Sequence, residues 1–512
     1  MKRAEVGLAL RDLTETKRVT SLSAEAVAVA QPTAEGLSHS KLSRRLVAAA
    51  STTGVGTILT MALSLLGSVA IARNGGPRGY ALYVIANMLV FVPAVLCSCG
   101  IPMTLSRHVA SEEEKGHHEA LRRSMTTMML LLIGLALLTG IVLSLNIAYF
   151  ERRLGVELGK GFALMLPLLL VCSVFSDGIV SIYFGMLRAR HAVFITLAAP
   201  LALILFMLIR RAGAPLPLWG AVAAFYIGAS LVALYKAWRD RLLGLPSSLR
   251  TVAPMFRDLV PTTVLTLFMT FTVWSDRWIA GSNLGVVAMG SYSAAIVIIQ
   301  AVLRVPKNMV VMLVPATARV SASGAEKSAS FNGVMISHFA LFAAIISVVL
   351  MLAPGLIVHT IFGYGFTFAA PALLWMAPSV LASAVSIPFI SALTGSTRNR
   401  LVTYLLLFTT LPRIALLVFF TRRWSLMGTA LATMLSDFLL ALCCVVLARV
   451  AHLSFPLKPL VRPYALGVLA FSIGLGALLV GLPQIPAIAL ALLVFLPEVR
   501  RVGRSLLSAG KS

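Results

Sequence analysis

Charged residues are scarce in this sequence, and acidic residues are the scarcest. Only 12% of the 512 residues are charged, with 18 acidic against 43 basic side chains, whereas soluble domains carry about 25% charged residues. Hydrophobic residues make up 59% of the chain, and the mean hydropathy is +0.93. This shortage of charge excludes an ordinary soluble protein. The alternating pattern of membrane β-strands is also absent, so we expect an all-α polytopic membrane protein.

Residue patterns that hold metals, disulfides or cofactors are lacking as well. The five cysteines all fall inside apolar segments, and no pair has metal-ligand or disulfide spacing. We interpret them as small core residues. His117 and His118 are adjacent and so do not share a helix face, which argues against a metal site there. The sequence therefore predicts no metal and no cofactor.

Basic residues give the chain a formal charge of +25, an excess that in other proteins indicates nucleic-acid binding. Here they are spread through short loops and both tails, so we expect no nucleic-acid partner. The apolar run VGLAL near the start is too short for a signal peptide. With the N-terminus in the cytoplasm, 32 of the 43 Lys and Arg residues fall on inner segments and 9 on outer loops. The positive-inside rule thus predicts that both termini are cytoplasmic.

Long apolar stretches recur along the chain, each long enough to cross a hydrocarbon core of about 30 Å as a helix. The sequence predicts about fourteen transmembrane helices, at 46–72, 80–100, 124–147, 162–184, 193–209, 217–235, 259–281, 290–312, 331–353, 369–393, 401–420, 426–448, 462–480 and 484–497. The outer loops between them are all short. No external domain remains that would hold an enzyme site.

These spans predict six segments along the chain. They are a flexible cytosolic N-terminal tail (1–45), a first six-helix bundle (46–235), a cytosolic linker (236–258), a second six-helix bundle (259–449), two extra C-terminal helices (460–497) and a basic cytosolic tail (498–512). The linker is basic enough to contact anionic membrane lipids.

The two bundles also share an internal repeat. ARNGGPRGYALYVIANMLV, from Ala72, resembles AGSNLGVVAMGSYSAAIVIIQ, from Ala280, and Arg107 and Arg319 lie 212 positions apart after each copy. Because six helices, an even number, separate the copies, both cross the membrane in the same sense. The sequence thus predicts two parallel repeats related by a pseudo-two-fold axis along the membrane normal.

Ionisable side chains interrupt four of the apolar segments. Asp177, Arg413 and Asp437 lie inside apolar runs, and the pair Asp276–Arg277 lies near the end of another. A charge at the bilayer centre costs about 2.5–3.5 kcal/mol even on lenient insertion scales, so such residues usually face a protein interior or a wet cavity. The pattern predicts a polar path through the membrane and is typical of transport.

The roles of these side chains remain open at this point. Arg413 can grip a phosphate with two parallel hydrogen bonds, or it can form a structural ion pair with an aspartate such as Asp437. Asp437, Asp177 and Asp276 are candidates for proton or cation coupling, with the same structural alternative. Asp276 and Arg277 can also neutralise each other.

The first helices of the two bundles carry matching polar stripes. These stripes consist of Thr53, Thr57, Thr60 and Ser64 in the first bundle and of Thr263, Thr266 and Thr270 in the second. Arg277 continues the second stripe. Such residues commonly join packed helices in membranes, but their equivalent positions in two repeats favour a shared cavity lining. The predicted cavity residues are Arg277, Arg413, Thr53, Thr57, Thr60, Thr266 and Thr270.

Several segments together resemble the multidrug/oligosaccharidyl-lipid/polysaccharide (MOP) exporter superfamily, particularly its bacterial polysaccharide, or O-antigen type, flippases. The resemblance covers about residues 43–450 and rests on ARNGGPRGYALYVIAN, GIPMTLSRHVAS, GMLRARH, SDRWIAGSNLGVVAMGSYSAA and IFGYGFTFAAPALLWMAPSV. It implies a fold like that of the MATE transporters, with two six-helix halves. The two extra C-terminal helices depart from the usual twelve and look more like lipid II flippases or fourteen-span exporters.

The resemblance also implies a function. Such a protein is an alternating-access flippase in the bacterial inner membrane, which carries polyprenyl-diphosphate-linked oligosaccharides to the outer leaflet for exopolysaccharide or O-antigen assembly. Its expected partners are the lipid-linked oligosaccharide, membrane lipids, and the polysaccharide polymerase and export machinery. Arg277 and Arg413 would supply a cationic cavity. The alternatives are a proton- or cation-coupled multidrug efflux transporter, a membrane glycosyltransferase, polymerase or ligase, and a scaffolding protein.

Overall fold

The computed structural model describes most of the chain beyond residue 38. The described residues are 39–114, 118–213, 216–246, 259–322, 325–394, 400–450, 456 and 458–501. The chain divides into two compact units, Met1–Ala48 and Ala49–Ser512. Of the first unit only residues 39–48 are described, and they are helical. The predicted N-terminal tail up to residue 38, the linker beyond residue 246 and the C-terminal tail beyond residue 501 lie outside the described residues, while residues 39–45 of that tail are helical.

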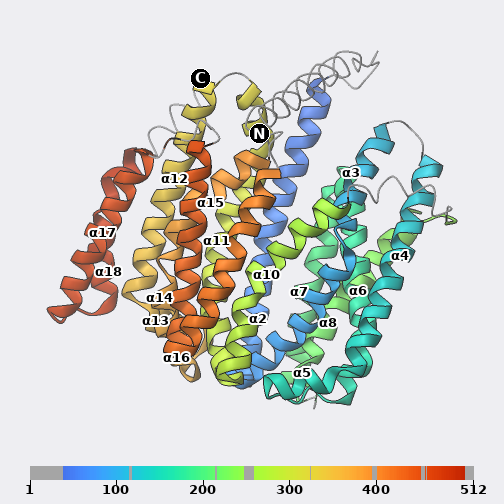
Figure 1. The fold of residues 1–512 in the computed structure, drawn as a ribbon, viewed down its shortest axis with the longest axis horizontal. Helices are drawn as coiled ribbons and strands as arrows, with labels where there is room; N and C mark the ends of the chain where they lie inside the picture. Colours follow the sequence, from blue (N-terminus) through green and yellow to red (C-terminus); the bar gives the residue numbers. More distant parts are fainter. Residues whose placement is uncertain are drawn as a thin grey trace, which may run out of the picture. The chain divides into compact units, whose positions relative to one another are not determined.

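The described residues are almost entirely helical (Figure 1). The first half contains α2 (His39–Ser98), α3 (Ile101–Glu114), α4 (His118–Leu145), α5 (Ile147–Leu154), α6 (Lys160–Gly185), α7 (Ala189–Arg211) and α8 (Gly220–Arg239). The second half contains α10 (Leu259–Leu284), α11 (Val286–Ala322), α12 (Ala325–Leu352), α13 (Pro354–Phe362), η1 (Tyr364–Phe366), α14 (Ala369–Met376), α15 (Ser379–Thr394) and α16 (Arg400–Val450). Two more helices follow, α17 (Lys458–Leu479) and α18 (Gln484–Leu493).

Apolar length makes these helices membrane spans. Among the described residues, nine helical segments are long and apolar enough to cross a membrane, or ten if α14 and α15, bent by 49°, form one span. Two of the nine, Thr52–Ser98 and Leu401–Val450, each contain two helices merged across a kink. The all-α polytopic fold is confirmed. α18 has only ten residues and is shorter than the other spans.

Both kinks lie at the same end of the bundle, which we call the kink end; α5 lies there too, across the ends of its neighbours (Figure 1). In α2 the break falls at Gly76, whose φ of 62° is in the left-handed region that glycine tolerates, and Pro77 follows it. In α16 the break falls at Trp424 and Ser425. Each kink reverses the chain direction and turns one long helix into a pair of antiparallel spans.

Equivalent helices pack in the same order in the two halves. α4 packs on α6 and α6 on α8 in the first half, as α12 packs on α15 and α15 on α16 in the second. The halves touch at the kink end, where Tyr80 packs against Phe362 and Phe366. At the opposite end the Thr263 hydroxyl donates to the Cys99 carbonyl oxygen over 2.6 Å. The space between the halves is thus bounded at both ends.

A close approach of the two halves involves Gly290 of α11. A Cβ atom on Gly290 would lie 2.0 Å from the carbonyl oxygen of Pro77. Because that obstacle is backbone, we expect Gly290→Ala to separate the halves and to cost about 1–3 kcal/mol of stability, as overpacking does. The measurement is the thermal unfolding midpoint in detergent. Gly134→Ala is the matched control because nothing lies within 4 Å of its new Cβ, and an equal midpoint for both variants would contradict the contact.

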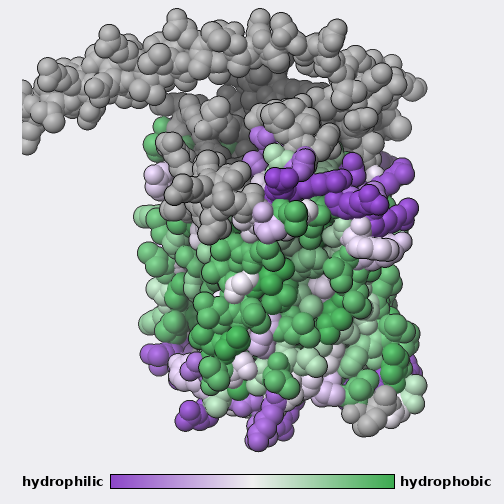
Figure 2. Space-filling view, turned by 90° about the vertical axis from the view of Figure 1, so that its right-hand side faces the viewer, coloured by the Kyte–Doolittle hydropathy of each residue, from purple (hydrophilic) through white to green (hydrophobic). Residues whose placement is uncertain are grey.

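The surface of the larger unit carries an apolar belt. Figure 2 shows hydrophobic residues over the middle of the molecule and hydrophilic residues toward both ends. The pair α17–α18 extends this belt by packing on α12. Glu498 anchors the pair through ion pairs with Arg462 at 2.8 Å and Arg501 at 3.7 Å. The belt is the surface that a helix bundle presents to lipid.

Candidate functional site

A cluster of buried charged and polar side chains lies inside the second half. This charge cluster consists of Asp276 from α10, Tyr292 from α11, and Arg413, Thr433 and Asp437 from the two arms of α16. Arg413 joins two aspartates: its Nη1 lies 3.1 Å from Asp437 Oδ1 and its Nη2 lies 3.8 Å from Asp276 Oδ2. The side chain of Asp276 is fully buried, that of Arg413 is 7% exposed and that of Asp437 is 27% exposed.

Asp276 is held by further hydrogen bonds. The Tyr292 hydroxyl donates to its Oδ2 over 2.9 Å and lies 2.8 Å from the Thr433 Oγ1. The backbone N–H of Arg277 donates to its Oδ1 over 2.7 Å. A buried carboxylate needs such partners because its loss of hydration is otherwise uncompensated. The cluster therefore ties α10, α11 and both arms of α16 together.

The two carboxylates of this cluster differ in accessibility. Both lie within ion-pair distance of the Arg413 guanidinium, but the Asp276 side chain is fully buried and the Asp437 side chain is 27% exposed. Asp437 is therefore the carboxylate of the cluster that solvent or an ion reaches more easily.

Arg277 points away from its neighbour Asp276. Successive residues of a helix lie about 100° apart, so adjacent side chains face different directions. The Arg277 guanidinium donates to the Val273 carbonyl over 2.8 Å and to Gln300 Oε1 over 3.1 Å. It also lies over the Trp274 ring, with 4.6 Å from Cζ to the ring centroid. All these partners are neutral, so Asp276 and Arg277 do not neutralise each other through their side chains.

A second cation, Arg304, lies on α11 near the partner of Arg277. It is exposed and is one helical turn beyond Gln300, which accepts a hydrogen bond from the Arg277 guanidinium. Within the part of the chain that the structure describes, neither arginine forms an ion pair with a carboxylate. Arg304 was not singled out from the sequence, where it reads as one of the cations at a helix end. The polar residue Gln300 four positions earlier is the signal that marks its helix face.

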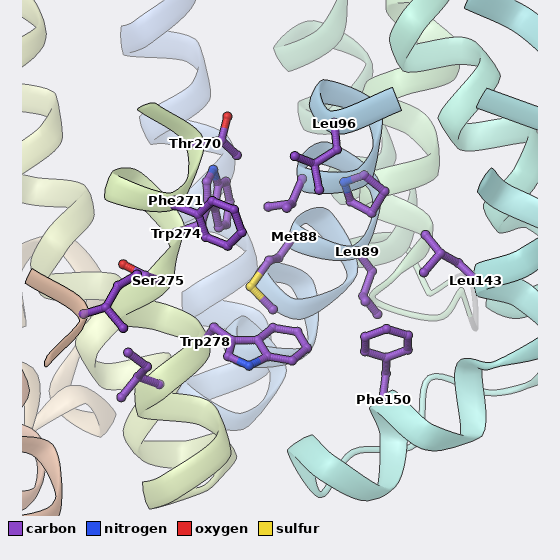
Figure 3. A pocket seen from close by; sticks show the side chains of 14 residues that line it. Met88, Leu89, Leu96, Leu143, Phe150, Thr270, Phe271, Trp274, Ser275 and Trp278 are labelled. Atoms are coloured by element: carbon purple, nitrogen blue, oxygen red, sulfur yellow. The ribbon is translucent and has the colours of Figure 1, made fainter. Parts of the chain in front are cut away.

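A cavity of about 360 Å³ lies between the halves. Figure 3 shows its walls, which come from the second arm of α2, the end of α4, α5 and the second part of α10. They consist of Met88, Leu89, Val92, Pro93, Leu96, Leu143, Phe150, Thr270, Phe271, Trp274, Ser275, Trp278, Ile279 and Ile414. The lining is almost wholly apolar and contains no charged side chain. Trp274 connects the cavity with Arg277.

The structure brings together only part of the predicted cavity lining. Thr270 lines the cavity, and its hydroxyl donates to the Thr266 carbonyl over 2.8 Å. In α2 the Thr57 hydroxyl donates to the carbonyl of Thr53, and that of Thr60 to the carbonyl of Gly56. None of these three α2 threonines lines the cavity. Their predicted role in substrate binding stays a prediction.

Asp177 lies apart from the charge cluster, on α6 of the first half. Its position is exposed, and within the described residues no ion pair with its carboxylate is formed. Of the three predicted coupling residues, the structure places Asp276 and Asp437 on one arginine and leaves Asp177 in the other half. In the described part of the chain, no three His, Cys, Asp or Glu side chains gather in a way that would hold a metal ion.

Comparison with known proteins identifies the family. A family model described as polysaccharide biosynthesis protein matches residues 46–321, more than half of the chain. The chain belongs to this family. Curated proteins gave no match to the sequence.

Solved structures of similar fold include a lipid II flippase and transporters of the MOP superfamily. The lipid II flippase MurJ in an inward-closed conformation superposes with a TM-score of 0.72 at 13% identity, over 89% of this chain and 99% of that one. A MATE family multidrug resistance transporter in an inward-facing conformation gives 0.65 at 17% identity, over 77% and 94%. A MOP superfamily transporter from Pyrococcus furiosus, described as having a binding pocket of reversed polarity, gives 0.58 at 15% identity, over 79% and 96%.

The family match and the apolar helices together make the chain a multi-pass membrane protein of the polysaccharide biosynthesis protein family. The expected MATE-like fold is confirmed, and the likeness to MurJ extends over 89% of the chain. The identities are low, so the solved structures show the fold alone, while the family match places the chain among polysaccharide biosynthesis proteins.

Proposed function

We propose that the protein is a flippase that moves polyprenyl-diphosphate-linked oligosaccharides from the inner to the outer leaflet, for exopolysaccharide or O-antigen assembly. The observation that carries this proposal is the pair Arg277 and Arg304. Arg277 lies within the apolar helix α10, and Arg304 lies at an exposed position of α11. Neither pairs with a carboxylate among the described residues. A diphosphate would supply the negative charge that they lack.

The chemistry of the guanidinium suits this substrate. It is always charged, and its planar array of donors matches two phosphate oxygens at once. Arg277 holds only neutral partners, which a phosphate can displace at small cost. Arg413 is already bound to two carboxylates. We therefore assign substrate binding first to Arg277 and retain Arg413 as a second candidate that would have to exchange partners.

We further propose that the two halves rock about the pseudo-two-fold axis. The contacts at the kink end and the Thr263–Cys99 hydrogen bond at the opposite end would then open alternately. The distribution of Lys and Arg supports cytoplasmic termini in a bacterial inner membrane. The proposed role in polysaccharide assembly makes a polysaccharide polymerase and the export machinery the expected protein partners. The predicted domain boundaries remain part of this proposal.

A proton- or cation-coupled efflux transporter is the second candidate function. The two buried or partly buried carboxylates of the charge cluster favour it, because organic cations and protons are attracted to carboxylates. Arg277 opposes it, because its guanidinium lies over the cavity-lining residue Trp274 and would repel a cationic drug. Coupling through Asp437 is compatible with either function, because protonation would remove the negative charge of its carboxylate.

The leaflet distribution of lipid-linked sugars tests the flippase in cells. In a strain that lacks the gene, we expect polyprenyl-linked oligosaccharides to accumulate on the cytoplasmic leaflet, with loss of surface polysaccharide, because synthesis continues while translocation stops. Radiolabelled sugars combined with a membrane-impermeant oxidant locate the intermediate. Normal intermediates together with new sensitivity to cationic drugs would contradict the flippase and support the efflux transporter.

A further inference from the structure

The cavity between the halves extends from the kink end to the middle of the membrane. Leu143 near the end of α4 and Phe150 of α5 line it at the kink end. Met88 is eleven residues beyond Pro77 at the kink end, which at a rise of 1.5 Å per residue is about 16 Å. Half of a hydrocarbon core of about 30 Å is about 15 Å. The cavity therefore reaches the bilayer centre.

The lining of the cavity is unsuited to a charged headgroup. Opposite the α10 wall it presents Leu89, Leu96, Leu143 and Phe150, and on α10 it presents chiefly aromatic side chains (Figure 3). Transfer of an unpaired charged group into such surroundings costs several kcal/mol or more. The guanidinium of Arg277 is directed to Val273 and Gln300, neither of which lines the cavity.

The cavity is suited to a hydrocarbon chain. Its volume of about 360 Å³ falls within the range of about 300–1,000 Å³ that is typical of ligand pockets. It is partly open, and the lining residues Leu96 and Phe271 remain 36% and 42% exposed. A chain that fills it would cover this apolar surface at about 25 cal/mol per Å².

Trp274 links this apolar site to the proposed phosphate site. Its side chain lines the cavity, while the Arg277 guanidinium lies over its ring at 4.6 Å. A molecule with a long apolar chain and a phosphate at one end would place the chain in the cavity and the phosphate at Arg277. A lipid diphosphate has this construction.

We propose that the cavity between α2, α4, α5 and α10 binds the isoprenoid chain of the lipid-linked substrate, next to its phosphate end. This inference rests on the proposed function, which makes that chain part of the transported molecule. The tail is then held inside the protein, close to Arg277, and does not remain wholly in the surrounding bilayer. α5 contributes Phe150 to the floor of the site, in contact with Trp278 at 5.9 Å between ring centroids.

Photo-crosslinking with a polyprenol that carries a diazirine on its chain and has no phosphate tests this site on the full-length protein in lipid nanodiscs. We expect labelling of α2, α4, α5 and α10 peptides that line the cavity. Leu143→Trp, which fills the cavity, should reduce this labelling about tenfold, a loss equal to about 1.4 kcal/mol. Leu138→Trp is the matched control, because Leu138 lies on the same helix, is 61% exposed and does not line the cavity.

Two further measurements keep the test decisive. Leu143→Ala enlarges the cavity and should retain labelling, and an unchanged melting midpoint shows that each variant is folded. Equal labelling of the lining in Leu143→Trp and the parent protein would overturn the proposal. It would also be overturned if a phospholipid with straight acyl chains reduced the labelling as much as an unmodified polyprenol does. If the protein transports lipid-linked oligosaccharide but its cavity is not labelled, this inference fails and the flippase function stands. If the cavity is labelled but the protein does not transport, the flippase function fails and the binding of the chain stands.

Discussion

Replacing Arg413 with leucine is expected to remove most of the folded protein. The substitution leaves the fully buried carboxylate of Asp276 and the partly buried carboxylate of Asp437 without their shared cation. Breaking a buried pair by removal of one partner costs about 3–5 kcal/mol, because an uncompensated buried charge remains. The measurement is the yield of monodisperse protein after extraction, together with its thermal unfolding midpoint.

Two controls give this prediction its meaning. Arg422→Leu changes an exposed arginine at the end of the same arm and should alter stability by no more than about 0.5 kcal/mol. The triple variant Arg413→Leu, Asp276→Asn, Asp437→Asn removes all three charges and should recover folded protein. If the triple variant folds but does not transport, the cluster serves transport as well as stability. A stable Arg413→Leu single variant would show that the ion pairs carry little energy.

Replacing Arg277 with glutamine is expected to reduce transport about 10- to 100-fold with little loss of folded protein. The side chain holds only neutral partners, so its removal strands no carboxylate. A hydrogen bond to a charged group contributes about 1.5–3 kcal/mol, which corresponds to this change in rate or affinity. The measurement is the initial rate of lipid-linked oligosaccharide translocation in reconstituted vesicles.

Arg277→Lys separates charge from geometry. Lysine keeps the positive charge but loses the planar donor array, so partial activity is expected if a phosphate is gripped by two donors. Arg304→Gln should also reduce the rate, since Arg304 is one helical turn beyond Gln300, which accepts a hydrogen bond from the Arg277 guanidinium. Arg422→Gln is the neutral comparison. Transport at the parental rate by both Arg277→Gln and Arg304→Gln would contradict the cationic site.

Hydropathy alone predicted most of the fold, because membrane spans follow from apolar length. The bend of 49° between α14 and α15 falls inside the single predicted span at 369–393. Pro378, directly before α15, is the local cause, since proline removes a backbone donor and α14 ends two residues before it. α2 begins at His39, seven residues before the predicted start at 46. These seven residues have no apolar periodicity, so hydropathy did not predict that they are helical.

The site was predictable only in part. Asp276, Arg277, Arg413 and Asp437 were found because charges stand out in apolar runs. The ion pair of Arg413 with Asp437 was one of the two alternatives that the sequence left open, and the structure contains it. The pairing of Arg413 with Asp276 was not predicted, because it depends on which face of α10 meets α16. The apolar character of the cavity was also hidden, since its walls come from segments far apart in the chain.

Translocation by the purified protein in vesicles tests the central claim most directly. Vesicles would carry a polyprenyl-diphosphate-linked oligosaccharide on one leaflet, and an impermeant glycosidase would report its arrival on the other. We predict translocation that exceeds that of protein-free vesicles and falls to near that level with Arg277→Gln. Translocation no faster than in protein-free vesicles, combined with proton-driven uptake of an organic cation, would contradict the account.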